Sequence, residues 1–182
     1  ACCLPIHYLY IIGGKMKKEK IYCFDFDGTL TTKDTLLEMI KFAKGKTRFL
    51  LGFLLYSPIL FLMKLHLFPN WKAKQLIFKH FFGGMTIEDF DELCVNFAMK
   101  NLYLLRFPGI ARIQEAQRKR ERVFVVSASI DNWVRPFFAF QNLDCVEVLG
   151  TQIEVVDGKV TGRFQTNNCY GEEKVHRICE AL

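Results

Sequence analysis

A short apolar run, Ile21–Phe24, ends directly in two aspartates and a glycine, and this feature constrains the fold most. The run is typical of a β-strand, on which Asp25 and Asp27 point to the same side. Gly28 then allows a sharp turn and a close approach to a ligand. Ligands of open α/β sheets bind at such strand ends, and a cation or shared proton would relieve the repulsion between the carboxylates. The alternative is an Asp-Gly turn that caps a helix beginning near Thr31.

Strand and helix patterns alternate after a long helical segment, which predicts an α/β fold with a parallel sheet. The run Val123–Ser127 is apolar throughout, as in a parallel strand covered on both faces, and it ends in a hydroxyl. Asp157-Gly158 predicts a β-hairpin turn. The other expected elements are helices over 109–122, 130–140 and from about 171, a strand over 144–149, and hairpin strands over 152–156 and 159–164.

We expect the core to comprise residues 16–32 and 107–182, with a helical cap inserted over 33–106. Because the insert leaves directly after the aspartate turn, it should hang over the strand ends as a lid. Residues 1–15 are expected to be an N-terminal extension outside the fold, since Met16 and its lysines resemble a natural start.

The densely apolar stretch 49–63 has two interpretations. It is shorter than the roughly 20 residues of a membrane span, and Pro58 should divide it into two short helices. We favour buried core of the cap. A hairpin that dips into a membrane surface is the alternative, because a basic segment precedes the stretch, comprising Lys41, Lys44, Lys46 and Arg48.

Composition narrows the function classes. The net charge of the 182 residues is +6, but the basic residues form separate clusters without a nucleic-acid-binding module, so we expect no nucleic-acid partner. An anionic substrate or a membrane surface fits. The seven cysteines include no C-x-x-C pair, which favours a reducing, cytoplasmic compartment over disulfides or structural zinc.

The predicted fold brings several reactive side chains to one edge of the sheet. Asp25 and Asp27 end the first strand, Ser127 ends the second, and Lys174 lies near the start of the last helix. A carboxylate nucleophile, a hydroxyl donor and a lysine suit phosphoryl transfer. The motifs DFDGTL, VFVVSAS and CYGEEKV, in this order, resemble the haloacid-dehalogenase-like (HAD) hydrolase superfamily, and the placement of the insert resembles its phosphoserine-phosphatase-like branch.

The resemblance implies a Rossmann-like core with a C1-type cap and a role for each motif residue. Asp25 would be the nucleophile that forms an aspartyl-phosphate, and Asp27 the acid and base. Mg²⁺ would bind Asp25 and the main-chain carbonyl of Asp27. Ser127 and Lys174 would hold the phosphate. The expected substrate-binding residues are Gly28, Thr29, Asp34, Ala128 and Ser129.

Plain structural alternatives remain for several of these residues. Ser127 and Ser129 could cap a helix, Lys174 could lie on a charged surface turn, and Asp34 could be an N-cap. For a substrate with a carboxylate, a cation from the cap would be needed, and Arg48, Lys72, Lys74 and Arg106 are candidates.

One part of the family pattern is missing, the acidic loop that supplies a further magnesium ligand. Nothing after Lys174 matches it, so we expect that the chain is truncated, that it binds magnesium weakly, and that the missing C-terminal strand leaves an open edge on the first strand.

Three functions follow in order of preference. The first is a magnesium-dependent phosphomonoesterase acting on a small phosphorylated metabolite. The second is a lipid phosphate phosphatase on the cytoplasmic face of a membrane, similar to the phosphatidylglycerophosphatase C type. The third is a binding protein that lost its metal site.

Overall fold

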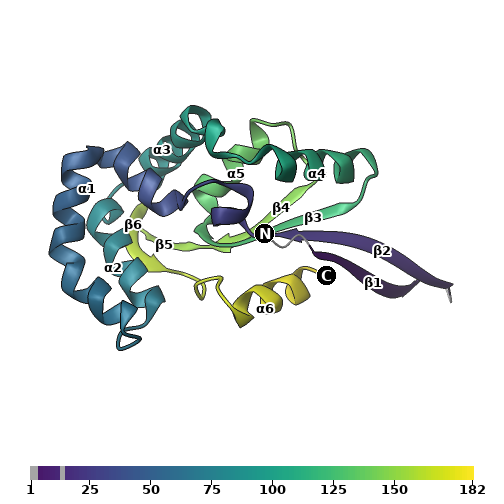
Figure 1. Ribbon diagram of the computed structural model, residues 1–182, viewed down its shortest axis with the longest axis horizontal. Helices are drawn as coiled ribbons and strands as arrows, with labels where there is room; N and C mark the ends of the chain where they lie inside the picture. Colours follow the sequence, from purple (N-terminus) through teal and green to yellow (C-terminus); the bar gives the residue numbers. More distant parts are fainter. Residues whose placement is uncertain (1–3, 13–14) are drawn as a thin grey trace.

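A parallel sheet forms the core of the protein, whose computed structural model describes residues 4–12 and 15–182. Strands β2 (Lys15–Phe24), β3 (Arg122–Ile130) and β4 (Val146–Thr151) pair in parallel, and β1 (Leu4–Ile12) pairs antiparallel with β2. The sheet order is β1-β2-β3-β4 (Figure 1). The predicted α/β class with parallel strands is confirmed.

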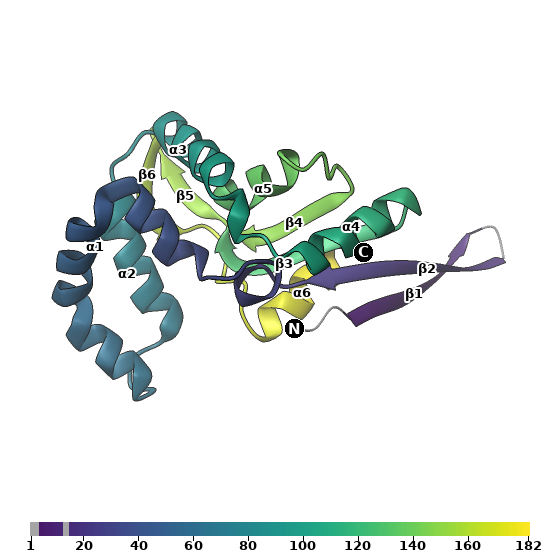
Figure 2. The same cartoon turned by 45° about the horizontal axis from the view of Figure 1, so that its top comes forward.

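Helices cover both faces of the sheet. Helices α4 (Phe107–Arg118) and α5 (Asp131–Ala139) lie on one face, and α6 (Glu172–Ala181) lies on the other (Figures 1 and 2). Successive β3 side chains therefore enter different clusters. Val123 and Val125 belong to the large core on the α4 and α5 side, whereas Phe124 and Val126 belong to the small cluster with α6. This double burial explains why β3 has only apolar residues from Val123 to Val126.

Three helices form the cap beyond the strand ends: α1 (Thr35–Lys64), α2 (Asn70–Phe82) and α3 (Ile87–Lys100). Short helical turns precede and follow them at Phe26–Leu30 and Leu102–Leu104. The two-stranded hairpin, β5 (Ile153–Val156) and β6 (Lys159–Phe164), lies beside α2 and α3 (Figure 1).

The hairpin turn has the predicted chemistry. Asp157 and Gly158 adopt φ values of 50° and 71°, the left-handed conformations that a two-residue hairpin turn requires.

The break in α1 lies at Gly45 and not at Pro58, so the prediction of two helices meeting at Pro58 was wrong. Gly45 has φ 78° and ψ 163°, far from helical values, while the helix runs through Pro58. Proline cannot donate to the carbonyl of Leu54, four residues earlier. The Ser57 hydroxyl donates to that carbonyl instead, at 2.8 Å, which helps α1 to tolerate the proline.

The apolar stretch of α1 is mostly exposed, contrary to the interpretation as buried cap core. Within residues 49–63 only Gly52 is buried, while Leu50, Leu51, Leu54 and Leu55 are 64%, 62%, 70% and 64% exposed. The inner side of the helix packs on the core through partly buried rings such as Phe53. No other described element covers the outer side.

Helix α1 is also long and apolar enough to cross a membrane by length and composition. Its most apolar window has a mean hydropathy of 1.4, and 6% of that window is buried. A core helix of a soluble protein can pass the same test, but such a helix would be mostly buried.

Strand β1 occupies the edge of β2 that we expected to be open. Its register runs from Leu4 opposite Cys23 to Ile12 opposite Lys15. Part of the expected N-terminal extension therefore belongs to the sheet, because the unpaired backbone groups of β2 find partners in the residues that precede it.

Candidate active site

Asp25 lies at the end of β2 and forms an ion pair with Lys174. Asp25 Oδ1 lies 2.7 Å from Lys174 Nζ and accepts a hydrogen bond from the Phe26 amide at 2.9 Å. Lys174 belongs to the first turn of α6, about 150 residues later in the chain. The Asp25 side chain is 42% exposed and lines a pocket, so a carboxylate oxygen can reach a ligand there. The structure thus brings together the predicted nucleophile and the predicted phosphate-binding lysine.

Asp27 is held by three donors. Its Oδ1 accepts hydrogen bonds from the amide and hydroxyl of Thr35 at 2.8 and 2.7 Å, and its Oδ2 accepts one from the Ser129 hydroxyl. Burial raises the pKa of Asp27, and the bonds from Ser129 and Thr35 oppose this shift. A carboxyl with a raised pKa that still has donors for its anion suits alternate roles as acid and base.

Hydrogen bonds within the turn itself hold the segment between the two aspartates and α1. Gly28 adopts φ 72°, which other residues rarely do, and its amide donates to Thr31 Oγ1 at 3.3 Å. The Thr31 amide donates to the Phe26 carbonyl at 3.0 Å. This loop directs the chain into α1, so that Thr35 reaches back to Asp27.

The end of β3 supplies the serines. Ser127 is buried, lines the pocket, and accepts a hydrogen bond from the Ser129 amide at 3.0 Å. Ser129 is also buried, but its hydroxyl contacts Asp27 and lies 3.2 Å from the hydroxyl of Thr35. Ser129 therefore positions Asp27 in the structure, although we had expected it to bind substrate.

A cavity of about 350 Å³, the catalytic pocket, joins these groups to the cap. Its lining includes Asp34, which also caps α1 by accepting from the Leu37 amide at 3.1 Å, so Asp34 is the expected N-cap and its role in substrate binding stays a prediction. Gly28, Thr29 and Ser129 do not belong to the lining. The predicted site residues that do are Asp25, Asp27, Asp34, Ser127, Ala128 and Lys174, and the apolar wall of the cap consists of Leu36, Leu37, Phe53, Leu60, Met63 and Ile77.

Lys74 is the cap cation that enters the pocket. Its ammonium donates to the carbonyl of Ala128, which also accepts from Thr151 Oγ1 at 2.9 Å. Burial lowers the pKa of Lys74, and Asp27 and Asp34 oppose the shift.

The other cap cations lie elsewhere. Arg106 donates to the Thr31 carbonyl at 3.0 Å, and Arg48 lines a different pocket. Nothing in the local sequence singled out Lys74 from these cations, because its place in the pocket depends on how α2 docks on the core.

Thr35 is a further residue that sequence reasoning missed. It is fully buried, donates to Asp27 and accepts a hydrogen bond from Trp133 Nε1 at 3.2 Å. The available signal was its place directly after Asp34, because the residue after a helix N-cap lies close to the preceding turn.

The oxygen ligands expected for Mg²⁺ are the Asp25 carboxylate and the Asp27 carbonyl. Among the described residues no three His, Cys, Asp or Glu side chains converge as a metal cluster. This sparse set is compatible with magnesium, which binds through one or two carboxylates and completes its shell with water and substrate oxygens. It does not suit zinc, which takes at least three protein ligands.

The comparison with a family model decides the classification. The model of haloacid dehalogenase-like hydrolases matches residues 23–182. The chain belongs to this family. The match begins at the end of β2, directly before Asp25 and Asp27, and it includes the three sequence motifs.

Known proteins agree with this classification. Protein CicA of Caulobacter vibrioides is 31% identical over 174 residues, which cover 93% of this chain and 76% of CicA. A Bordetella pertussis protein of unknown function shares the fold with a TM-score of 0.71 and 16% identity, covering 88% of this chain and 72% of that one. A phosphoserine phosphatase, solved as a phospho-aspartyl intermediate analogue, has a TM-score of 0.52 and 21% identity, covering 90% and 74%. The expected likeness to the phosphoserine-phosphatase-like branch is confirmed for the fold.

Proposed function

We propose that this hydrolase is a magnesium-dependent phosphomonoesterase that works through an aspartyl-phosphate intermediate on a small phosphorylated metabolite. The observation that carries the proposal is the 2.7 Å ion pair between Asp25 and Lys174 next to Asp27, whose pKa burial raises. The similar phosphoserine phosphatase, which was solved as a phospho-aspartyl intermediate analogue, supports the same intermediate.

In the first step an oxygen of the Asp25 carboxylate attacks phosphorus and the bond to the leaving oxygen breaks. The electron pair goes to the leaving oxygen, which takes the proton of Asp27. Lys174 and Ser127 hold the phosphoryl oxygens while their charge develops. Bound magnesium would offset the repulsion between the phosphate and Asp25.

In the second step the Asp27 carboxylate takes a proton from water, and the resulting hydroxide attacks phosphorus. The bond between phosphorus and Asp25 breaks, so Asp25 is again a carboxylate and Asp27 again carries a proton. Thr35 and Ser129 donate to Asp27 during this step, which stabilises its anionic form.

The test is hydrolysis of p-nitrophenyl phosphate with and without magnesium. We expect turnover that EDTA abolishes and that Asp25→Asn lowers by at least about 10³-fold, because the nucleophile is lost. Asp157→Asn, in the exposed hairpin turn, is the matched control. Activity that survives both EDTA and Asp25→Asn would contradict the mechanism, and a folded protein with no phosphatase activity would favour the binding-protein alternative.

The second candidate is a lipid phosphate phosphatase at the cytoplasmic face of a membrane. The exposed outer side of α1 favours it, together with the apolar wall that Phe53, Leu60 and Met63 give to the catalytic pocket. Exposed basic residues at both ends of this surface, Lys46, Arg48 and Lys64, complement anionic lipid. Four free thiols, those of Cys94, Cys145, Cys169 and Cys179, fit a reducing compartment.

Co-sedimentation with vesicles that contain phosphatidylglycerol tests this candidate. The triple variant Leu50→Asn, Leu54→Asn, Phe61→Asn should bind at least about tenfold more weakly, because these exposed side chains would otherwise enter the bilayer. The matched control is Val95→Asn, Met99→Asn, Tyr103→Asn, three exposed apolar residues away from α1. Equal partitioning of the two variants and the unmodified protein would reject membrane docking through α1.

A further inference from the structure

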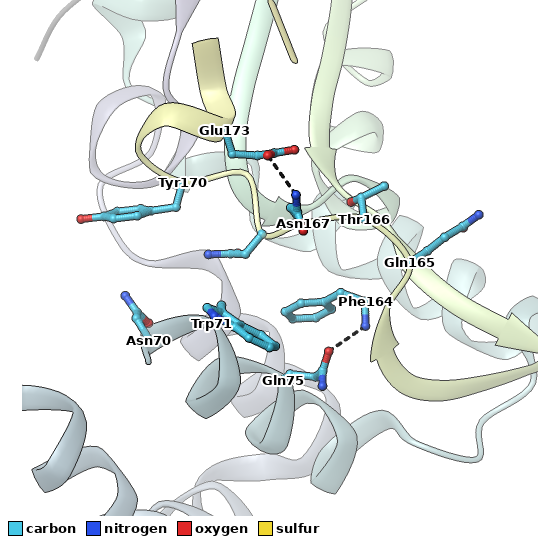
Figure 3. A pocket seen from close by; sticks show the side chains of 10 residues that line it. Asn70, Trp71, Gln75, Phe164, Gln165, Thr166, Asn167, Tyr170 and Glu173 are labelled. Atoms are coloured by element: carbon cyan, nitrogen blue, oxygen red, sulfur yellow. Dashed lines mark hydrogen bonds between the residues drawn. The ribbon is translucent and has the colours of Figure 1, made fainter. Parts of the chain in front are cut away.

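A second cavity of about 440 Å³, the amide pocket, lies beside the catalytic pocket and has no part in the proposed chemistry. Residues from the start of α2 form one side of it, and the segment between β6 and α6 forms the other (Figure 3). The two cavities share Asn70, Asn168 and Tyr170, so a substrate whose phosphate lies at Asp25 can extend into the amide pocket.

The polar lining of the amide pocket consists largely of Asn and Gln side chains. Two of these side chains use only part of their hydrogen-bonding groups within the protein. Gln75 Oε1 accepts from the Phe164 amide at 3.0 Å, and Asn167 Nδ2 donates to Glu173 Oε2 at 3.2 Å (Figure 3). In both residues the protein holds one end of the amide in place, and the other end is left for a ligand. Donors and acceptors that are held in this way suit hydroxyl groups, which both donate and accept.

The charge of the amide pocket argues against an anionic leaving group. No lysine, arginine or histidine is among the described residues that line it. The lining contains the charged residue Glu173, which pairs with Arg177 at 3.1 Å, so neither group is left as a counter-ion for a carboxylate. A leaving group such as that of phosphoserine or phosphoglycerate would therefore find no counter-ion here.

Aromatic rings complete the lining. Trp71 and Tyr170 are 44% and 66% exposed, and Phe164 lies near Trp71 in Figure 3. The exposed indole of Trp71 offers a flat apolar surface on which the C–H face of a saturated ring can pack. The hydroxyl groups at the edge of such a ring would then meet the fixed amides.

We propose that the amide pocket binds the leaving group of the substrate and that this group is an uncharged, hydroxyl-rich ring, namely a sugar. The inference rests on the first proposed function, because it places the phosphate of a sugar phosphate at Asp25. It assigns the substrate class through Trp71, Gln75 and Asn167.

Two measurements test the assignment. The first compares kcat/KM for ribose 5-phosphate and glucose 6-phosphate with that for phosphoserine, 3-phosphoglycerate and acetyl phosphate, whose two-carbon group is too short to fill the amide pocket. We expect the sugar phosphates to exceed phosphoserine by at least about tenfold. Adenosine monophosphate is included to show whether the sugar is free or part of a nucleoside.

The second measurement needs no turnover. Asp25→Asn protein should bind ribose 5-phosphate more tightly than inorganic phosphate in calorimetry, and adding Trp71→Ala should reduce this difference by about threefold to tenfold. Tyr103→Ala, an exposed aromatic outside the amide pocket, is the matched control and should change nothing.

The outcomes separate the two levels of the proposal. Absence of Asp25-dependent turnover of p-nitrophenyl phosphate would contradict the proposed function. Turnover with a preference for phosphoserine or for a lipid phosphate, or binding of ribose 5-phosphate that Trp71→Ala does not alter, would overturn the sugar assignment alone.

Discussion

Two neighbouring carboxylates in the site have different environments. Asp25 is 42% exposed and paired with Lys174, while Asp27 is enclosed by Thr35 and Ser129. Burial therefore raises the pKa of Asp27. The difference suits the proposed roles, in which one residue acts as nucleophile while the other carries a proton.

This environment gives Asp27 a defined effect on stability. Burial raises the pKa of Asp27 in the folded protein above its ordinary value, so its contribution to the free energy of unfolding is fully present below the ordinary pKa and is lost as pH rises through the folded pKa. Asp27→Asn removes this loss. We expect the variant to become more stable relative to the unmodified protein as pH rises above about 4, measured by urea unfolding.

The control for this measurement is Asp157→Asn, an exposed aspartate in the hairpin turn. It removes one carboxylate from an exposed position, and the gain of Asp27→Asn with rising pH should exceed any change in this variant. A gain no larger than that of Asp157→Asn would show that the protein does not raise the pKa of Asp27.

At the scale of elements, α1 shows how one residue divides a long helix. Gly45 adopts φ 78° and ψ 163°, a region that is essentially restricted to glycine. The short first part of α1 packs on the core through Met39 and Ile40, and the second part carries the exposed leucines. The break thus separates a core helix from an outer helix of different character.

Gly45→Ala should strain this break. A Cβ at Gly45 would meet no atom within 4 Å, so the expected cost of about 1–3 kcal/mol is conformational and not steric. Faster amide hydrogen exchange in residues 46–64 is the measurement, with Lys46→Ala, the next residue, as the control. Unchanged exchange in Gly45→Ala would show that the break does not depend on the glycine.

At the scale of the whole molecule, the hairpin holds the cap. The Gly84 amide donates to the Val160 carbonyl at 2.8 Å, and the Val160 amide donates to the Met85 carbonyl at 2.9 Å. Nearby, Gly162 approaches Lys79 of α2 so closely that a Cβ would lie 2.5 Å from Lys79 Cβ. These contacts join the cap to the core beside the amide pocket.

Gly162→Ala should therefore push α2 away from β6. We expect a loss of about 1–3 kcal/mol in the free energy of unfolding beyond that of Gly158→Ala, measured by urea denaturation. Gly158 is the matched control because it also has a positive φ but no atom within 4 Å of an added Cβ. The difference in the free energy of unfolding between the two variants therefore measures the cost of the contact between position 162 and Lys79. Equal losses would mean that the cap can shift without cost.

The sequence by itself determined the parallel core and the grouping of Asp25, Asp27, Ser127 and Lys174. The carboxyl ends of parallel strands lie at the same edge of the sheet. The residues that follow the apolar runs therefore meet there, independently of how the cap packs. Helix and strand periods are local, and they were sufficient for the order of the core elements after the cap and for the Asp157-Gly158 turn.

Only the tertiary structure decided which cap residues enter the site and what stays exposed. Lys74, Thr35 and the lining of the amide pocket depend on how α1 and α2 dock on the core and its hairpin, and such long-range packing leaves no mark in local periodicity. The same holds for the outer side of α1, because an apolar run has the same sequence pattern whether it is covered or not. The pairing of β1 with β2 was missed for a related reason, since a strand edge can accept any extended neighbour.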